Sequence, residues 1–192
     1  MKKTAETKVP LLSEIAERWS PRAYDSTHNL TNDELLAVLE AGRWAPSAMN
    51  FQPWRFSVAL RGDALHTKIV ADAFSGFNAA WAPNASAIIF ISTQNVTAEG
   101  EPYPIALFDA GLAAQSMMIQ AQALGLATHP ISGYKHDVAA KILGLEAGRV
   151  SVAAIVLGKS TDPSVLSASA QEREIAPRTR LSLEEIVLHG LN

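Results

Sequence analysis

The chain has 192 residues and a net charge of -3; 48% of its residues are hydrophobic and 18% are charged. This length suits a single domain spanning 1–192, with ample material for a core. No broad basic field is available to bind nucleic acid or an anionic membrane. The absence of cysteine excludes disulfides, thiolate metal sites and a cysteine nucleophile. The low charge content indicates that some apolar surface is buried against another subunit.

The sequence predicts neither a secretion signal nor a membrane span. The opening MKKTAETKVP is basic, but no apolar run of the roughly 7–15 residues found in signal peptides follows it. The most apolar later stretch, 105–128, is interrupted by Asp109 and three glutamines, which argues against a transmembrane helix. We therefore expect a cytoplasmic protein.

Helices and strands alternate in the first half of the chain. Helical spacing of apolar residues predicts a helix at 10–19, which Pro21 stops. Thr31 and Glu34 form a capping box that opens a second helix, and this helix must end before Pro46. Further along, the pattern predicts a strand at 54–60, an amphipathic helix at 63–74 and a buried strand at 87–92.

The second half begins with the longest helical pattern, 108–124, with Gly125 placed just after its end. Its apolar residues lie nearly all round, which predicts a central helix packed on several sides. There follow a strand at 125–132 with a turn at Pro130, a helix at 137–143, a core strand at 150–158 and a short helix capped by S-L-E-E at 182–185. Residues 159–181 form a polar tail with little core material, either disordered or laid on something else. This order predicts an α+β fold in which helices surround one small sheet.

Two pairs of arginines, near opposite ends of the chain, are candidate anion ligands. In R-W-S-P-R, Pro21 forces Ser20 away from helical geometry, so Arg18, Ser20 and Arg22 could surround one anion at a helix end. Arg178 and Arg180 would share a face of an extended segment and could reach a single phosphate. Taken alone, each pair is better explained as solvated surface arginines. Together they carry more weight.

The segment T-H-P-I-S-G-Y, 128–134, is predicted to expose backbone amides in a turn suited to the polar edge of a ring system. His129 within it could be a general acid, although a single histidine near a strand end is more often structural. The sequence contains no zinc-binding histidine spacing, G-x-G-x-x-G, P-loop or G-x-S-x-G nucleophile motif. A cofactor must therefore carry any chemistry.

Residues 44–56, W-A-P-S-A-M-N-F-Q-P-W-R-F, link a helix to a strand. Trp54 and Phe56 are expected in the core. Ser47 and Asn50 are less easily explained by a structural turn, because two prolines stiffen a segment that carries a hydroxyl and an amide. Stiff flanks of this kind are a usual way to place a few polar contacts in an apolar pocket.

These stretches together resemble the FMN-dependent nitroreductase family over nearly the whole chain. R-W-S-P-R-A-Y-D is similar to the family's R-x-S-x-R-x-F-D opening, and A-P-S-A-M-N-F-Q-P-W to its A-P-S-x-x-N-x-Q-P-W signature. The segment from F-D-A-G-L to H-P-I-S-G resembles the long central helix and the turn after it, and P-R-T-R-L the basic closing segment. The second motif is specific, and the others gain weight because they occur in register.

The resemblance implies a nitroreductase-like α+β fold with a mostly antiparallel sheet, as an intertwined homodimer with two FMN sites at its interface. Residues 159–192 would be a C-terminal extension that wraps the partner subunit. Arg22 would lie at the N1/O2 edge of the flavin, and Trp19 would contribute its backbone. The full set of implied FMN contacts is Arg18, Trp19, Ser20, Arg22, Asn78, Pro130, Ile131, Ser132, Gly133, Arg178 and Arg180, with Pro46, Ser47 and Asn50 reaching the flavin of the other subunit.

The implied activity is that of an FMN-dependent NAD(P)H oxidoreductase reducing small acceptors such as nitroaromatics or quinones by a ping-pong mechanism, without a catalytic side chain. One alternative is a relative that cleaves flavin or removes halogens, and another is a flavin-binding module without turnover. Met49 departs from the small polar residues usual in the signature, which puts the wall of the substrate pocket in doubt.

Overall fold

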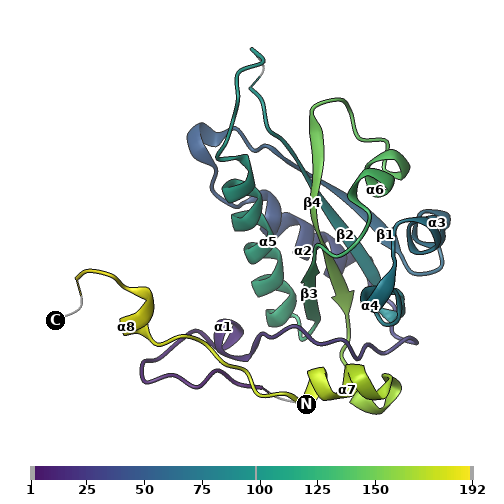
Figure 1. Cartoon of the computed structure of the whole chain (residues 1–192), viewed down its shortest axis with the longest axis vertical. Helices are drawn as coiled ribbons and strands as arrows, with labels where there is room; N and C mark the ends of the chain where they lie inside the picture. Colours follow the sequence, from purple (N-terminus) through teal and green to yellow (C-terminus); the bar gives the residue numbers. More distant parts are fainter. Residues whose placement is uncertain (1–2, 98, 191–192) are drawn as a thin grey trace.

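The computed structural model describes residues 3–97 and 99–190. Its centre is a four-stranded antiparallel sheet in the order β1-β2-β4-β3. The strands are β1 (Trp54–Leu60), β2 (Ala87–Gln94), β3 (Ala127–Ile131) and β4 (Arg149–Gly158). The helices are α1 (Ser13–Glu17), α2 (Asn32–Arg43), α3 (Ala64–Asp72), α4 (Gly76–Ala79), α5 (Ala106–Ala123), α6 (His136–Ile142), α7 (Ala168–Ile175) and α8 (Leu183–Ile186), with 3-10 turns at Ala48–Asn50, Ala82–Asn84 and Pro163–Val165 (Figure 1).

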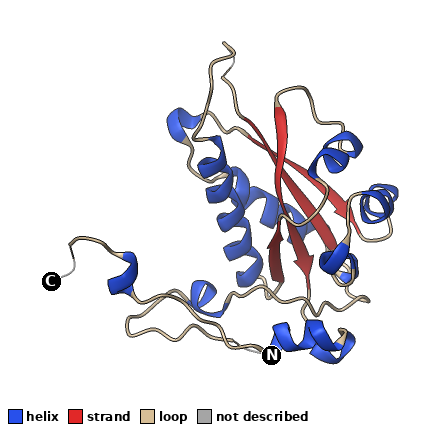
Figure 2. Cartoon of the chain, in the orientation of Figure 1, coloured by secondary structure: helices blue, strands red, loops and turns tan. Residues whose placement is uncertain are grey.

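Helices cover both faces of this sheet, which is why its two central strands are buried on either side (Figure 2). Ile89 and Ile91 of β2 face α2 and α5, where they join a core with Met117. Ile88 and Phe90 face the opposite way and pack with residues of α3 and α6. Because successive side chains of a strand point to opposite faces, a continuous apolar run serves both cores.

Two local signals in the sequence are confirmed at the ends of helices. Thr31 and Glu34 form both hydrogen bonds of the predicted capping box at the start of α2. Gly125 follows α5 with φ 72°, a left-handed conformation that glycine adopts without a steric penalty. Helix α2 also approaches α5 closely, since a methyl group on Gly42 would collide with Met117. The predicted central helix is therefore correct, although it begins two residues earlier than expected.

The turn predicted at Pro130 is wrong in its position. Pro130 lies within β3, opposite Ile155 of β4, and the chain turns only after Ile131. Strand β3 is at the edge of the sheet and pairs with a neighbour on one side only. A proline, which has no N–H group, can be accommodated in such a strand where its nitrogen faces the free side, because no hydrogen bond between strands is lost there. The first helix is also shorter than predicted, because only Ser13–Glu17 is helical.

The C-terminal tail contains more core material than its polarity predicted. Leu166, Ala170 and Glu174 are buried, and α7 packs against the core of its own domain. From Ala176 onward the chain instead runs beside the N-terminal segment, and the two project from the body as one arm that ends in α8 (Figure 1). The predicted polar tail thus divides into a helix that belongs to the domain and an exposed arm.

Among the helices that the structure describes, none has both the length and the hydrophobicity needed to cross a membrane.

Candidate functional site

Arg18 of the first arginine pair meets Arg178 and Arg180 of the second near the C-terminal end of α5, although about 160 residues of chain separate them. Arg18 follows α1 with extended backbone angles, and its Nη1 donates to the Ser20 hydroxyl at 3.4 Å. Arg178 donates from Nη1 to the carbonyl oxygen of Ala16, 2.8 Å away, which ties the C-terminal arm to the end of α1. Burial lowers the pKa of Arg18, and the positive charges of Arg178 and Arg180 lower it further.

Among the described residues, no ion pair with a carboxylate balances this cluster of like charges. Within residues 3–97 and 99–190, neither Arg18, Arg178 nor Arg180 forms an ion pair. Like charges held together in this way destabilise one another unless an anion binds between them. Guanidinium groups suit phosphate because they can donate two parallel hydrogen bonds to it. The cluster therefore has the composition of a phosphate site.

Arg22 faces a different part of the site. Its Nη1 lies 3.8 Å from the buried carboxylate of Glu174, which also accepts hydrogen bonds from the amides of Arg22 and Ala23. The guanidinium carbon lies 5.6 Å from the centroid of the Phe77 ring, and Arg173 lies against the same ring at 4.3 Å. Burial lowers the pKa of Arg22, although the charge of Glu174 acts in the opposite direction.

The Nε atom of Arg22 is buried and finds no hydrogen-bond partner in the described part of the chain. A buried donor without a partner is costly, so a ligand that brings an acceptor to this point gains free energy. This orphaned donor is the clearest observation that the site is built for a polar ligand.

The turn after β3 and helix α4 form the next wall of the site. Asn78 donates from Nδ2 to the carbonyl oxygen of Gly133 at 3.1 Å. A Cβ atom on Gly133 would lie 2.9 Å from Asn78 Nδ2, so a larger residue there would displace the Asn78 side chain. The Gly133 amide donates no hydrogen bond to any described residue. An open pocket of about 440 Å³ is lined here by Ser75, Phe77, Asn78, Gly133, Tyr134 and Lys135.

Pro130 and Ser132 are exposed beside this pocket, but the side chain of Ile131 is buried in the core. Ile131 can therefore offer only its backbone to a ligand. Since Phe77 contacts Arg22 and Asn78 contacts Gly133, the structure joins Arg22, Asn78 and the 130–133 turn into one continuous region.

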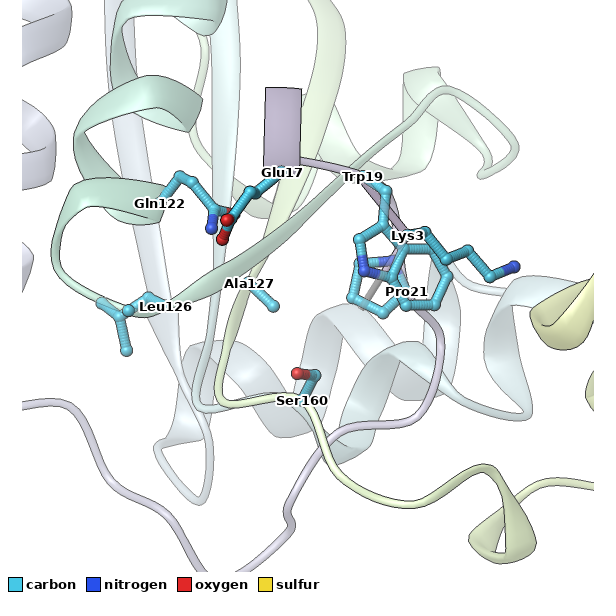
Figure 3. A pocket seen from close by; sticks show the side chains of 9 residues that line it. Lys3, Glu17, Trp19, Pro21, Gln122, Leu126, Ala127 and Ser160 are labelled. Atoms are coloured by element: carbon cyan, nitrogen blue, oxygen red, sulfur yellow. The ribbon is translucent and has the colours of Figure 1, made fainter. Parts of the chain in front are cut away.

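The side chain of Trp19 is occupied elsewhere. It lies with Pro21 in a small pocket of about 160 Å³ whose other walls include Gln122, Leu126, Ala127 and Ser160 (Figure 3). The ammonium group of Lys3 lies 4.5 Å from the centroid of the Trp19 ring. The Trp19 side chain is thus engaged by Lys3 and by the residues around this pocket.

The loop with Pro46, Ser47 and Asn50 is not part of this region in the same chain. Its Ala48 amide lies 3.4 Å from Asp109 in the first turn of α5, whereas Trp19 lies near Gln122 at the other end of that helix. At a rise of about 1.5 Å per residue, these two ends of α5 are roughly 20 Å apart. The loop and the arginine cluster of a single chain therefore lie toward opposite ends of α5.

His129 has a structural environment. Its Nδ1 lies 2.9 Å from the carbonyl oxygen of Pro21, so this nitrogen carries a proton and donates it. The ring packs against Trp81 with centroids 4.6 Å apart. Burial lowers the pKa of His129 to about 4, an effect to which the charges of Arg22 and Arg18 also contribute. A neutral imidazole that braces the R-W-S-P-R segment explains these contacts better than a general acid does.

Sequence reasoning missed Glu174, Phe77, Tyr103 and Asp109. No motif marks them, because each acts through a partner more than 5 residues distant in sequence. Glu174 lies within 159–181, the stretch whose composition predicts a polar tail. Asp109 interrupts the apolar stretch 105–128, and a carboxylate on an apolar central helix is the signal in the sequence that could have found it.

The fold and the site define an α+β protein with an arginine cluster where its two termini meet and an open pocket beside Phe77 and Gly133. Residues 15–159 match the profile described as the Nitroreductase family, and the chain belongs to that family. Within residues 3–97 and 99–190, no group of three or more His, Asp or Glu residues is arranged to bind a metal ion.

The relatives support the same assignment. A protein of Bacillus subtilis (strain 168) named "Putative NAD(P)H nitroreductase YdgI" is 29% identical over 187 residues, which covers 78% of this chain and 88% of the relative. A crystal structure described as an oxidoreductase containing FMN is 34% identical with a TM-score of 0.89, covering 97% of this chain and 94% of the other. A "putative nitroreductase in complex with FMN" from Desulfovibrio desulfuricans is 27% identical with a TM-score of 0.73, covering 97% and 99%. The predicted nitroreductase-like fold is confirmed.

Proposed function

We propose that this chain is an FMN-dependent NAD(P)H oxidoreductase that reduces small acceptors such as nitroaromatics or quinones by a ping-pong mechanism. The observation that carries the proposal is the convergence of Arg18, Arg178 and Arg180, none of which forms an ion pair with a described residue. The names of relatives agree with it, because they include NAD(P)H nitroreductases and an FMN-containing oxidoreductase. When bound, FMN would supply the redox chemistry that carries electrons from NAD(P)H to the acceptor.

The residues of the site fit FMN from its phosphate to its ring. Arg18, Ser20, Arg178 and Arg180 hold the phosphate through charge-assisted hydrogen bonds. Arg22 provides a positive charge and the unpartnered Nε donor further along, and this charge favours the anionic form of the reduced ring. Glu174 fixes the backbone at Arg22 and orients its side chain.

The other wall is the exposed turn 130–133 with Asn78, whose hydrogen bond to Gly133 shapes the pocket for the ring. No side chain is required as an acid or base, which agrees with the structural role of His129.

We further propose that the protein is a homodimer in which Pro46, Ser47 and Asn50 of one subunit complete the FMN site of the other. The separation of the loop and the arginine cluster along α5 supports this arrangement. The exposed arm supports it too, because Leu181, Leu183, Ile186 and Leu188 are more than half exposed in a single chain. In the dimer, the arm from 176 onward wraps the partner subunit, while 163–175 stays on its own chain. The protein works in the cytoplasm.

The cofactor assignment is tested by purifying the protein and measuring its absorption spectrum. We expect a yellow protein with one FMN per chain that oxidises NADH or NADPH when a nitroarene or quinone is added. A colourless preparation that also fails to bind added FMN would refute the assignment. A flavin that NADH and NADPH leave oxidised would instead indicate a binding module, and cleavage of FMN in air would indicate a flavin-cleaving enzyme.

The shared site is tested by mixing two defective variants. Asn50 has φ 58°, so Asn50→Gly removes the side chain without straining the backbone. If the loop acts across the interface, an Arg18→Ala/Asn50→Gly heterodimer contains one intact site and one site with both defects. Its activity should recover to about half that of the wild-type dimer. Activity that stays as low as in the two parent homodimers would place both residues in one subunit's site.

A further inference from the structure

Residues 47–52, named here the 47–52 loop, adopt a backbone conformation that their sequence does not favour. Met49, Asn50 and Gln52 have φ of 50°, 58° and 49°, in the left-handed region. Asparagine is often found there, but methionine and glutamine rarely are. Conformations of this kind persist only where the surrounding structure imposes them. Contacts outside the loop must therefore hold it.

One set of contacts comes from Asp109 and Tyr103. Asp109 is only 1% exposed, and its Oδ1 accepts a hydrogen bond from the Ala48 amide at 3.4 Å. Its Oδ2 accepts a hydrogen bond of 2.6 Å from the Tyr103 hydroxyl. The Tyr103 ring in turn meets the edge of Phe51, with centroids 5.1 Å apart. Asp109 and Tyr103 thus contact the loop at two points, Ala48 and Phe51.

The electrostatics of this pair are suited to a permanent contact. Asp109 lies in the first turn of α5, where the unpaired amides of the helix favour a negative charge. Burial raises the pKa of Tyr103 to about 12, and the hydrogen bond and charge of Asp109 act in the same direction. The phenol therefore remains protonated, and so a donor, at neutral pH.

The far end of the loop is held by backbone contacts from two arginines. Arg55 donates to the carbonyl oxygen of Gln52 at 3.1 Å, and Arg149 donates to that of Pro53 at 3.1 Å. Because these two arginines donate hydrogen bonds to backbone carbonyl oxygens, the pair is better explained as support for the loop than as an anion site.

Held at both ends, the loop presents two polar groups outward. The Ser47 hydroxyl accepts a hydrogen bond from the Gln52 amide at 3.0 Å, which leaves its own proton to donate. The Asn50 carboxamide is exposed and makes no hydrogen bond within the described residues. Both groups depend on the left-handed turn at 49–50, because an extended backbone there would point Asn50 in another direction.

We infer that Tyr103 and Asp109 are positioning residues that hold the 47–52 loop in the conformation that offers Ser47 and Asn50 to the cofactor of the neighbouring subunit. This inference rests on the proposed function, because it takes FMN as the ligand. Neither residue contacts the cofactor in this arrangement. They act by keeping the binding-competent conformation of the loop populated, and a smaller competent fraction weakens the observed affinity in proportion.

The test compares Tyr103→Phe with Tyr24→Phe. The first removes the hydroxyl that donates to Asp109, and the second removes a buried hydroxyl that donates to Val156 at 3.2 Å, away from the loop. Amide hydrogen exchange is measured on the apoprotein for the 47–52 loop and for β2 and β4, and FMN affinity is measured by titration. Asp109→Asn keeps the shape of the side chain and provides a second variant if Tyr103→Phe does not fold.

We expect Tyr103→Phe to exchange faster in the 47–52 loop and to bind FMN up to about tenfold more weakly, as for one lost hydrogen bond. Exchange in β2 and β4 should match the wild type, and Tyr24→Phe should leave both loop exchange and FMN affinity unchanged. Wild-type exchange in the loop of both Tyr103→Phe and Asp109→Asn would overturn the inference, as would unchanged FMN affinity. Failure of the wild type to bind FMN would instead refute the proposed function. Amide exchange in the 47–52 loop is measured on the apoprotein, so it tests the role of Tyr103 and Asp109 in holding the loop independently of FMN binding.

Discussion

His129 should make the stability of the apoprotein depend on pH. In the unfolded chain this histidine titrates at its ordinary pKa of 6.5, whereas burial against Trp81 lowers the pKa in the folded protein to about 4. The unfolded state therefore binds more protons between these values. The stabilisation from neutral His129 is complete above the unfolded pKa and is lost as the pH falls from 6.5 toward 4.

The size of the effect follows from the two pKa values. Linkage gives a loss of about 1.8 kcal/mol in the free energy of unfolding between pH 7 and pH 5. The loss arises because the folded site disfavours the charged ring: burial is the largest cause, the charges of Arg22 and Arg18 add to it, and together they outweigh the hydrogen bond to Pro21, which favours the charged form. A change of this size is a substantial part of the stability of an ordinary domain.

The measurement is urea unfolding of the apoprotein at the two pH values, at a fixed protein concentration so that association does not change the result. His129→Asn is the matched variant, because its amide can still donate to Pro21 but does not titrate. Carboxylates and the other histidines contribute equally to both proteins. The wild type should therefore lose about 1.8 kcal/mol more than the variant between pH 7 and pH 5. The same pH dependence in both proteins would refute the reasoning.

Three further substitutions test the site and the core. Arg18→Ala should weaken FMN binding by about 1.5–3 kcal/mol, or roughly 10- to 150-fold. The control is Arg43→Ala, which breaks an exposed ion pair and should leave FMN binding unchanged. Equal FMN affinities of the two variants would show that Arg18 is not part of the phosphate site. Glu174→Ala should lower the free energy of unfolding by about 3 kcal/mol, since Arg22 is left without its buried partner, and an unchanged urea midpoint would contradict this. Gly42→Ala should cost about 1–3 kcal/mol in the same assay because its methyl group has no room against α5, and a variant as stable as the wild type would mean that the helices can separate freely there.

Local structure was predicted well where the signal and the structure lie within a few residues of one another. The capping box at Thr31 acts over three residues, and the glycine after α5 satisfies a conformational need at one position. The strand at 54–60 was predicted with its observed bounds, because apolar and β-branched residues fit a sheet whichever neighbours it has. In such cases the side chain and the backbone it affects belong to the same turn or strand.

Pro130 shows the limit of local reasoning. A proline after a strand normally predicts a turn, but whether it can remain in the strand depends on whether that strand is at an edge. The position of β3 in the sheet is decided by its pairing with β4, some 20 residues further along. The same holds for α7, which looks like a polar tail until Glu174 is placed beneath the amides of Arg22 and Ala23.

By itself, the sequence determined the kinds of groups that the site contains: two arginine pairs, a turn with available amides and a stiff loop with a hydroxyl and an amide. Only the tertiary structure decided which of them act together. It brought Arg18 to Arg178 across the length of the chain, and it set the 47–52 loop at the opposite end of α5 from both. The physical reason is that spacing along the chain governs contacts within a helix or turn, whereas contacts between distant segments follow from how the helices and the sheet bury their apolar faces.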